Sequence, residues 1–207
     1  LKLENTAQIA IDGGTYKGFT TDLKEEMLQE TRHFFQQLVL TDRSALNMLD
    51  STFTMLNEPL ARHYGVAGVT GQAYREVTLE EQGRGGLLGH ASVLMLGSDG
   101  KDSHPIRRAV WLRDRLLNDP PAPPPADVPD LDESNPEFAS LSIREQLEVH
   151  RAKESCASCH RGIDPWGIAL ENYDAIGKFR TEVNSRPVGA TDRLPNGQEL
   201  RGAAGLK

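Results

Sequence analysis

The chain has 207 residues, of which 38% are hydrophobic and 26% are charged, so we expect one compact domain or two small ones rather than a fibre or a disordered tail. The formal net charge is −7 and no basic block stands out, which argues against a surface for nucleic acid or for an anionic membrane. The longest apolar stretch, residues 87–97, is interrupted by His90 and is shorter than the ~20 residues that span a bilayer, so we expect no membrane span.

The N-terminal part of the chain predicts helices. Apolar residues recur with a helical period over residues 21–40, which predicts an amphipathic helix of about five turns with one face in the core. Shorter helices are expected at residues 44–49 and 58–63. The second of these has Asn57 as its N-cap and Gly65 as its stop signal.

The middle of the chain is rich in glycine and then in proline. Within residues 80–96 only the later part, residues 87–96, is expected to be helical, and the glycines are expected to allow close approach to a flat ligand: Gly83, Gly85, Gly86 and Gly89. Pro105 suits the first turn of a helix over residues 105–118. Residues 119–129 contain six of the 12 prolines and predict an extended surface spacer at the one internal boundary.

One more helix is expected before the cysteines, over residues 142–150, because Ser142 and Glu145 have the spacing of a capping box. A few extended residues are expected at residues 15–19 and in the tail from Arg186. The predicted fold class is therefore mainly α and irregular, with long loops and a proline-rich spacer.

The two cysteines of the chain lie in one motif, Cys156-Ala-Ser-Cys159-His160. C-x-x-C-H is the attachment sequence for c-type haem, in which the two thiols add to the vinyl groups and the histidine binds the iron. We therefore expect one covalent haem, held by Cys156 and Cys159, with His160 as an axial ligand of the iron, in an irregular helical haem domain that is cytochrome-c-like. Haem of this kind is loaded during export, so we expect a periplasmic or extracellular protein.

Other interpretations of these residues stay open. A thioredoxin-like redox pair calls for a strand before the motif, whereas residues 142–150 predict a helix. A zinc site of Cys156, Cys159, His150 and a remote histidine would need four ligands, and the sequence has no second C-x-x-C. Two unmodified core cysteines are the remaining alternative.

The ligand on the other side of the iron is ambiguous. His63 at a helix end and Met95 on an apolar helix are the candidates, followed by His104. Each of them also has an ordinary structural interpretation as a core, capping or locally bonded side chain.

The surroundings of the haem can also be predicted. Four arginines are candidates to pair with the propionates: Arg107, Arg108, Arg151 and Arg161. Three aromatic residues after the motif are candidates to pack against the macrocycle: Trp166, Tyr173 and Phe179. Pro165 is expected to turn the chain, and a carbonyl of that turn is expected to accept the Nδ1–H of His160.

Longer motifs carry a resemblance to a known family. They are RGGLLGHASVLMLGSDG at 84–100, HPIRR at 104–108, LLNDPPAPPP at 116–125, CASCHRGIDPWGIALENYDAIGKFR at 156–180 and LNEPLARHYG at 56–65. Over roughly residues 20–200 the chain resembles the C-terminal half of the large planctomycete-type cytochrome c domain proteins, whose domains are mostly uncharacterised.

The resemblance implies a secreted or periplasmic multidomain protein with c-type haem. It implies that residues 1–75 close a preceding domain, that residues 76–183 bind the haem and that residues 184–207 begin a further domain. The chain would then be a segment of a longer protein, with a redox protein or other haem domains as partners.

The expected function is electron transfer through one haem outside the cytoplasm. The alternative is a haem oxidoreductase of peroxidase or oxidase type, whose iron keeps an open position for a substrate. The sequence therefore leaves open whether the protein is an enzyme.

Overall fold

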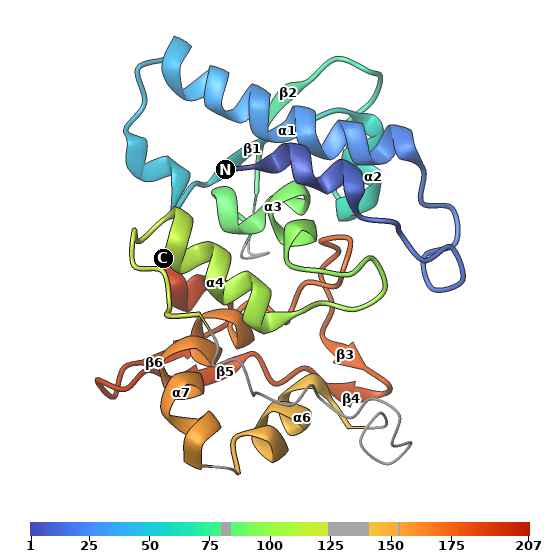
Figure 1. Cartoon of the computed structure of the whole chain (residues 1–207). Helices are drawn as coiled ribbons and strands as arrows, with labels where there is room; N and C mark the ends of the chain where they lie inside the picture. Colours follow the sequence, from blue (N-terminus) through green and yellow to red (C-terminus); the bar gives the residue numbers. More distant parts are fainter. Residues whose placement is uncertain (80–83, 124–140, 153) are drawn as a thin grey trace.

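Figure 1 shows the computed structural model of the chain, which describes residues 1–79, 84–123, 141–152 and 154–207. The described part is mainly helical with long loops, which confirms the predicted fold class at that level. Gly83 and most of the predicted proline-rich spacer, residues 124–129, lie outside the described residues.

The described part of the chain contains both α-helices and 3-10 helices (η). The α-helices are α1 (Thr21–Leu40), α2 (Glu58–Tyr64), α3 (Ala91–Leu96), α4 (Pro105–Arg115), α6 (Ile143–His150) and α7 (Glu154–Ile168). The 3-10 helices are η1 (Leu3–Gln8), η2 (Ala45–Met48), η3 (Leu87–Gly89) and η4 (Ala203–Leu206).

Within the described residues the strands form three small antiparallel pairs. They are β1 (Phe53–Leu56) with β2 (Arg75–Thr78), β3 (Glu182–Val183) with β4 (Arg186–Pro187), and β5 (Thr191–Arg193) with β6 (Glu199–Arg201). The extended residues expected in the tail are confirmed. Those expected at residues 15–19 are wrong, because that segment consists of turns.

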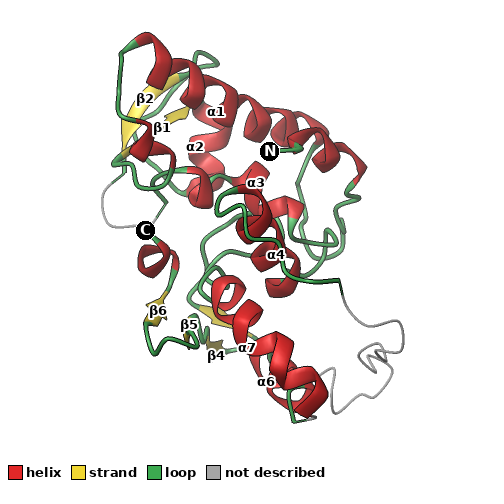
Figure 2. Ribbon diagram, turned by 60° about the vertical axis from the view of Figure 1, so that its left-hand side comes forward, coloured by secondary structure: helices red, strands yellow, loops and turns green. Residues whose placement is uncertain are grey.

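The elements are arranged from one end of the molecule to the other. In both views α1, α2 and the β1–β2 pair lie at one end, α6 and α7 with the short strands of the tail at the other, and α3 and α4 between them (Figures 1 and 2). The C-x-x-C-H motif, on α7, is therefore at the end opposite to α2.

Capping and periodicity explain the helices that the sequence predicted well. The helix α1 has the predicted bounds, and Asn57 caps α2 by accepting a hydrogen bond from the backbone N–H of Leu60 at 3.2 Å. The capping box of Ser142 and Glu145 is present at the start of α6. These local interactions fix helix ends without help from tertiary packing.

Other helices differ from their predicted bounds. The segment predicted as one helix over 87–96 is divided into η3 and α3, with His90 in an extended conformation between them. The helix α4 ends at Arg115 rather than at 118, and the predicted helix at 44–49 is the single 3-10 turn η2.

The core of the α1 end consists of side chains from α1, β1, α2 and α3. Met27, Leu56, Leu60 and Met95 are fully buried in one cluster, and a neighbouring cluster is built on Phe34. Burying one such side chain contributes about 1.5–3 kcal/mol to folding. The core therefore fixes α2 and α3 against α1.

The core of the other end joins α4 and α7 to the tail. Leu112 of α4 packs with Leu170 and Tyr173, which follow α7, and with Ala203 of η4. Gly167 of α7 allows the two helices to approach, since an added Cβ would lie 1.9 Å from the carbonyl oxygen of Pro105.

The glycines expected to face a flat ligand serve instead for backbone packing. A Cβ on Gly85 would lie 1.4 Å from the carbonyl oxygen of Ser51, and one on Gly89 would lie 1.8 Å from that of Arg84. The space that these glycines leave is filled by the chain itself, so that prediction is wrong for these two residues.

Candidate functional site

The cysteine motif lies within α7, which continues past it without a break. The helix spans Glu154–Ile168 and contains Pro165 in its last turn. The prediction that Pro165 turns the chain after His160 is therefore wrong. A proline this close to the end of a helix removes one hydrogen bond, the one that its N–H would have donated to the carbonyl of Arg161.

The two cysteines are adjacent on this helix. Their spacing of three residues places both side chains on neighbouring positions of one face. Cys156 is half-buried and Cys159 is exposed, and both are present as thiols rather than as a disulfide. The two cysteines therefore lie about one helical turn apart, at or near the protein surface.

His160 is held by a carboxylate on its own helix. Its Nδ1 lies 2.7 Å from Oδ1 of Asp164, four residues later. A carboxylate only accepts, so the Nδ1–H donates and Nε2 carries the lone pair of the neutral ring. The predicted partner, a backbone carbonyl, is corrected to the side chain of Asp164, but the tautomer that it would fix is the same.

Asp164 is also paired with an arginine. Its side chain is fully buried, and Arg151 Nε, just after α6, lies 3.3 Å from Asp164 Oδ2 as an ion pair. Arg151 Nη1 lies 3.6 Å from Oδ2 of Asp192 on β5, and the His150 ring meets the His160 ring edge-on at 4.9 Å between centroids. We call His160, Asp164, Arg151, Asp192 and His150 the motif cluster.

The motif cluster brings together the end of α6, the helix α7 that follows it, and the strand β5 of the tail. The sequence predicted Arg151 as a propionate partner, whereas in the structure its guanidinium is paired with two carboxylates. Asp164 and Asp192 were missed. For Asp164 a signal existed, since an acid four residues after a histidine on a helix lies within reach of its ring.

A zinc site finds no support in the described part of the chain. Among these residues no group of three or more histidine, cysteine, aspartate or glutamate side chains is placed to hold a metal ion.

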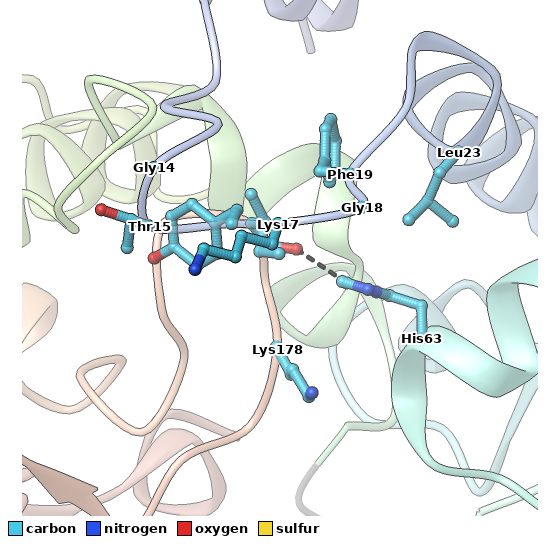
Figure 3. Close-up of a pocket in the computed structure, with 10 residues that line it drawn as sticks. Gly14, Thr15, Lys17, Gly18, Phe19, Leu23, His63 and Lys178 are labelled. Carbon is cyan, nitrogen blue, oxygen red and sulfur yellow. Dashed lines mark hydrogen bonds between the residues drawn. The ribbon is translucent and has the colours of Figure 1, made fainter.

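His63 belongs to a different part of the molecule. Its ring lies at a pocket (Figure 3). The pocket has a volume of about 560 Å³, and the Nε2 of His63 lies 3.0 Å from the carbonyl oxygen of Ile176. The lining residues from the first loop include Thr15, Lys17 and Phe19. Burial lowers the pKa of His63 to about 4, so the ring is neutral at neutral pH.

Met95 is a core residue. It is fully buried with Met27, Leu56 and Leu60 in the cluster under α1. His104, the third candidate, has its Nε2 3.2 Å from Oδ2 of Asp99. The structure therefore brings none of the three predicted second ligands into the motif cluster.

The remaining predicted residues have structural partners. Arg108, predicted as a partner of the propionates, is buried, and its guanidinium donates to the carbonyls of Leu94, Leu170, Tyr173 and Asp174. Arg107 and Arg161 are exposed.

The predicted aromatic residues pack on the α4 side of α7. Trp166 and Tyr173 belong to the cluster built on Leu112. Phe179 meets the Tyr173 ring edge-on, with 5.6 Å between the centroids, and is 41% exposed.

A second buried polar group, which the sequence did not predict, lies between α1 and β1. Glu30 accepts hydrogen bonds from the hydroxyls of Tyr64 and Thr54, and burial raises its pKa to about 7. The His90 ring lies beside it, with Nδ1 2.9 Å from the Thr31 hydroxyl, and burial lowers the pKa of His90 to about 3. At neutral pH the imidazole is therefore neutral.

Comparison with known proteins finds two family models. Residues 84–183 match PSCyt3, described as a protein of unknown function (DUF1588), and residues 1–66 match PSD4, described as a protein of unknown function (DUF1592). The model names agree with the resemblance to planctomycete-type cytochrome c proteins, and neither description states a haem or an activity. No curated protein and no solved structure matches the chain.

No helix in the described ranges is both long and apolar enough to cross a membrane.

Proposed function

We propose that this chain is a c-type cytochrome module that binds one covalent haem and transfers electrons. The observation that carries the proposal is the bond from His160 Nδ1 to Asp164 within a C-x-x-C-H helix. It leaves Nε2 as the basic nitrogen of the ring, which is what an iron ligand requires. The residues present therefore fit the group that the motif indicates.

Each residue of the motif has a distinct role in this proposal. Cys156 and Cys159 would hold the porphyrin through thioether bonds, and His160 would be a ligand of its iron. A haem bound there supplies a one-electron ferric–ferrous couple. The exposed position of Cys159 keeps this edge near the surface, where electrons can pass to a partner.

The location and the partner follow from the same proposal. Covalent haem is attached during export, so the protein would act in the periplasm or outside the cell. Its partner would be a redox protein or another haem domain.

The test is whether haem stays on the exported protein after denaturation. We expect the parent to keep a haem that resists acid–acetone extraction and to show sharp reduced α and β bands. Cys156→Ser and Cys159→Ser should each lose one thioether and shift the α band of the pyridine complex. His160→Ala should lose the low-spin spectrum.

Ser158→Ala is the matched control, because it changes the motif between the cysteines but removes neither sulfur nor imidazole. It should match the parent in both haem content and spectrum. A parent protein that carries no covalent haem would overturn the proposal and favour thiol or zinc chemistry at the cysteines.

A haem oxidoreductase with an open iron position is the second candidate. It is favoured by the positions of His63 and Met95, since one is bonded to a carbonyl at a distant pocket and the other is packed in the core. Carbon monoxide separates the two functions. A reduced spectrum that does not respond supports the electron carrier, and one that shifts supports the enzyme.

A further inference from the structure

Asp164 is the least exposed acidic group of the motif cluster. Its side chain is 0% exposed, although an ionised carboxylate is costly to bury unless it is paired. It has two partners: the Nδ1–H of His160 at Oδ1 and the guanidinium of Arg151 at Oδ2. Asp164 is therefore a buried acid whose position is fixed by an imidazole and a guanidinium, and it is not a solvated acid on the surface.

Arg151 and Asp164 form an ion pair without an aligned hydrogen bond, so the carboxylate can still accept hydrogen bonds on Oδ2. Arg151 Nε is 3.3 Å from Oδ2, and that oxygen has no aligned hydrogen bond among the described residues. Arg151 is itself shared with Asp192 of β5. The carboxylate of Asp164 is therefore only partly neutralised, and its best-aligned contact is the one with His160.

From this geometry we infer that Asp164 is a positioning residue that fixes the ring of His160 and lowers the reduction potential of an iron bound to Nε2; this rests on the function proposed above. A carboxylate that accepts the second N–H of a ligating histidine fixes its orientation and raises its basicity. A more basic ligand stabilises the ferric ion, which carries the higher charge, more than the ferrous ion. Arg151 opposes this effect because it draws charge from the same carboxylate.

Other charged side chains near Asp164 also affect the reduction potential of an iron bound to His160. Arg151, after α6, faces the carboxylate, Asp192 on β5 pairs with Arg151, and Arg161 is an exposed cation on α7 itself. Of these three charged side chains, Arg151 is the one with a described contact to Asp164. Arg161 thus provides a comparison in which a cation is removed near His160 without a change in the partners of Asp164.

The experiment measures the ferric–ferrous equilibrium of the haem-loaded, exported full chain. Asp164→Asn keeps an oxygen that accepts the Nδ1–H but removes the charge. We expect it to shift the ferrous-to-ferric ratio at a fixed ambient potential about tenfold toward ferrous haem, which is 59 mV for a one-electron couple. The control is Asp119→Asn, which changes an exposed acid that follows α4 and pairs with Arg113 of that helix. It should leave the ratio unchanged.

Arg151→Gln gives the opposite sign. With the guanidinium removed, the carboxylate acts more strongly on His160, and the ratio should shift several-fold toward ferric haem. Arg161→Gln should shift it less. In the Asp164→Asn background the effect of Arg151→Gln should become smaller, because the arginine acts through a carboxylate that is no longer charged.

The orientation of the ring has its own readout. In the electron paramagnetic resonance spectrum of the ferric protein, Asp164→Asn should keep the parent line widths, whereas Asp164→Ala should broaden them because no acceptor holds the ring. If Asp164→Ala fails to fold, Asp164→Asn and Arg151→Gln still test the inference.

The outcomes separate the inference from the proposed function. A parent without covalent haem defeats the proposed function itself. A parent with covalent haem whose ferrous-to-ferric ratio is the same in Asp164→Asn and Asp119→Asn would overturn the role of Asp164 and leave the cytochrome proposal standing.

Discussion

Glu30 shows how a single residue departs from what its local sequence predicts. It lies on the amphipathic helix α1, yet it is 1% exposed, because Tyr64 from α2 and Thr54 from β1 converge on its carboxyl group. Both hydroxyls donate to the carboxyl oxygens, and burial outweighs them, so the pKa rises to about 7. The group is therefore close to half-protonated at neutral pH.

This raised pKa predicts a pH-dependent stability. The unfolded chain has the ordinary pKa of 4.5, so between about pH 4.5 and 7 the folded state holds a proton that the unfolded state has lost. The contribution of Glu30 is thus fully present below pH 4.5 and is lost as the pH rises toward 7. Its size is about 3 kcal/mol at 1.36 kcal/mol for each pH unit.

Glu30→Gln mimics the protonated form and tests this directly. Urea unfolding of the variant and the parent should give a difference in free energy of unfolding that grows in favour of the variant between pH 4.5 and 7.5. His63 and His90, whose lowered pKa values act with the opposite sign below pH 6.5, are present in both proteins and cancel. A difference that stays flat with pH would show that Glu30 is charged in the folded protein at all these pH values.

At the scale of elements, the contact between α4 and α7 depends on one glycine. Gly167 faces the backbone of Pro105 at the start of α4, where a Cβ would come within 1.9 Å of a carbonyl oxygen. Gly162 lies on the same helix, but a Cβ there would meet only the flexible end of Arg113 at 3.9 Å. Two glycines on one helix therefore have different physical reasons to be present.

Alanine at these two positions should have opposite effects on stability. Gly167→Ala forces the helices apart and should cost about 1–3 kcal/mol or more. Gly162→Ala meets no obstacle and should stabilise the protein by about 0.5–1 kcal/mol, because alanine loses less conformational freedom in a helix. Thermal unfolding monitored at 222 nm checks both, and equal effects would contradict the packing argument.

The same elements show what the sequence could and could not predict. The bounds of α1 and the caps of α2 and α6 were predictable, because they rest on periodicity and on side chains within a few residues. The strand β1 was missed, since a fully buried run of four residues has no alternation to distinguish it from a helix.

The candidate site, too, could be predicted from the sequence only in part. Cys156, Cys159 and His160 were singled out by a local motif, and the structure places them on one helix. Their role in binding haem stays a prediction. The placement of Arg151 and Asp192 beside Asp164 depends on how α6 and β5 pack against α7, which no local pattern contains. The prediction for Pro165 was wrong because this proline lies in the last turn of α7, where it removes only one backbone hydrogen bond and does not stop the helix before it.

At the scale of the whole molecule, Arg84 joins the two ends. Its side chain is 2% exposed and donates to the carbonyls of Gly89 and Gly177. Its guanidinium lies 3.8 Å from the ring centroid of Tyr64 on α2 and 5.0 Å from that of Tyr173. Residues from both family matches thus surround one cation.

This arrangement predicts that the α1 end and the α7 end of the molecule unfold together and that Arg84 couples their unfolding. In the parent, the fluorescence of Trp111 and Trp166, which both lie in the Leu112 cluster, should report the same urea midpoint as far-UV circular dichroism, to which α1 contributes. Arg84→Met leaves two buried carbonyls without their donor and removes both ring contacts. It should cost about 3 kcal/mol or more and separate the two midpoints.

Arg107→Met is the control, because Arg107 is an exposed arginine with one long hydrogen bond of 3.4 Å, to the Ser98 carbonyl. It should stay within about 0.5 kcal/mol of the parent and keep the midpoints together. If Arg84→Met also unfolds with coincident midpoints, the two ends are held together by their apolar clusters rather than by the cation between them. The separation of the midpoints, more than the loss of stability, is therefore the result that identifies Arg84 as the link.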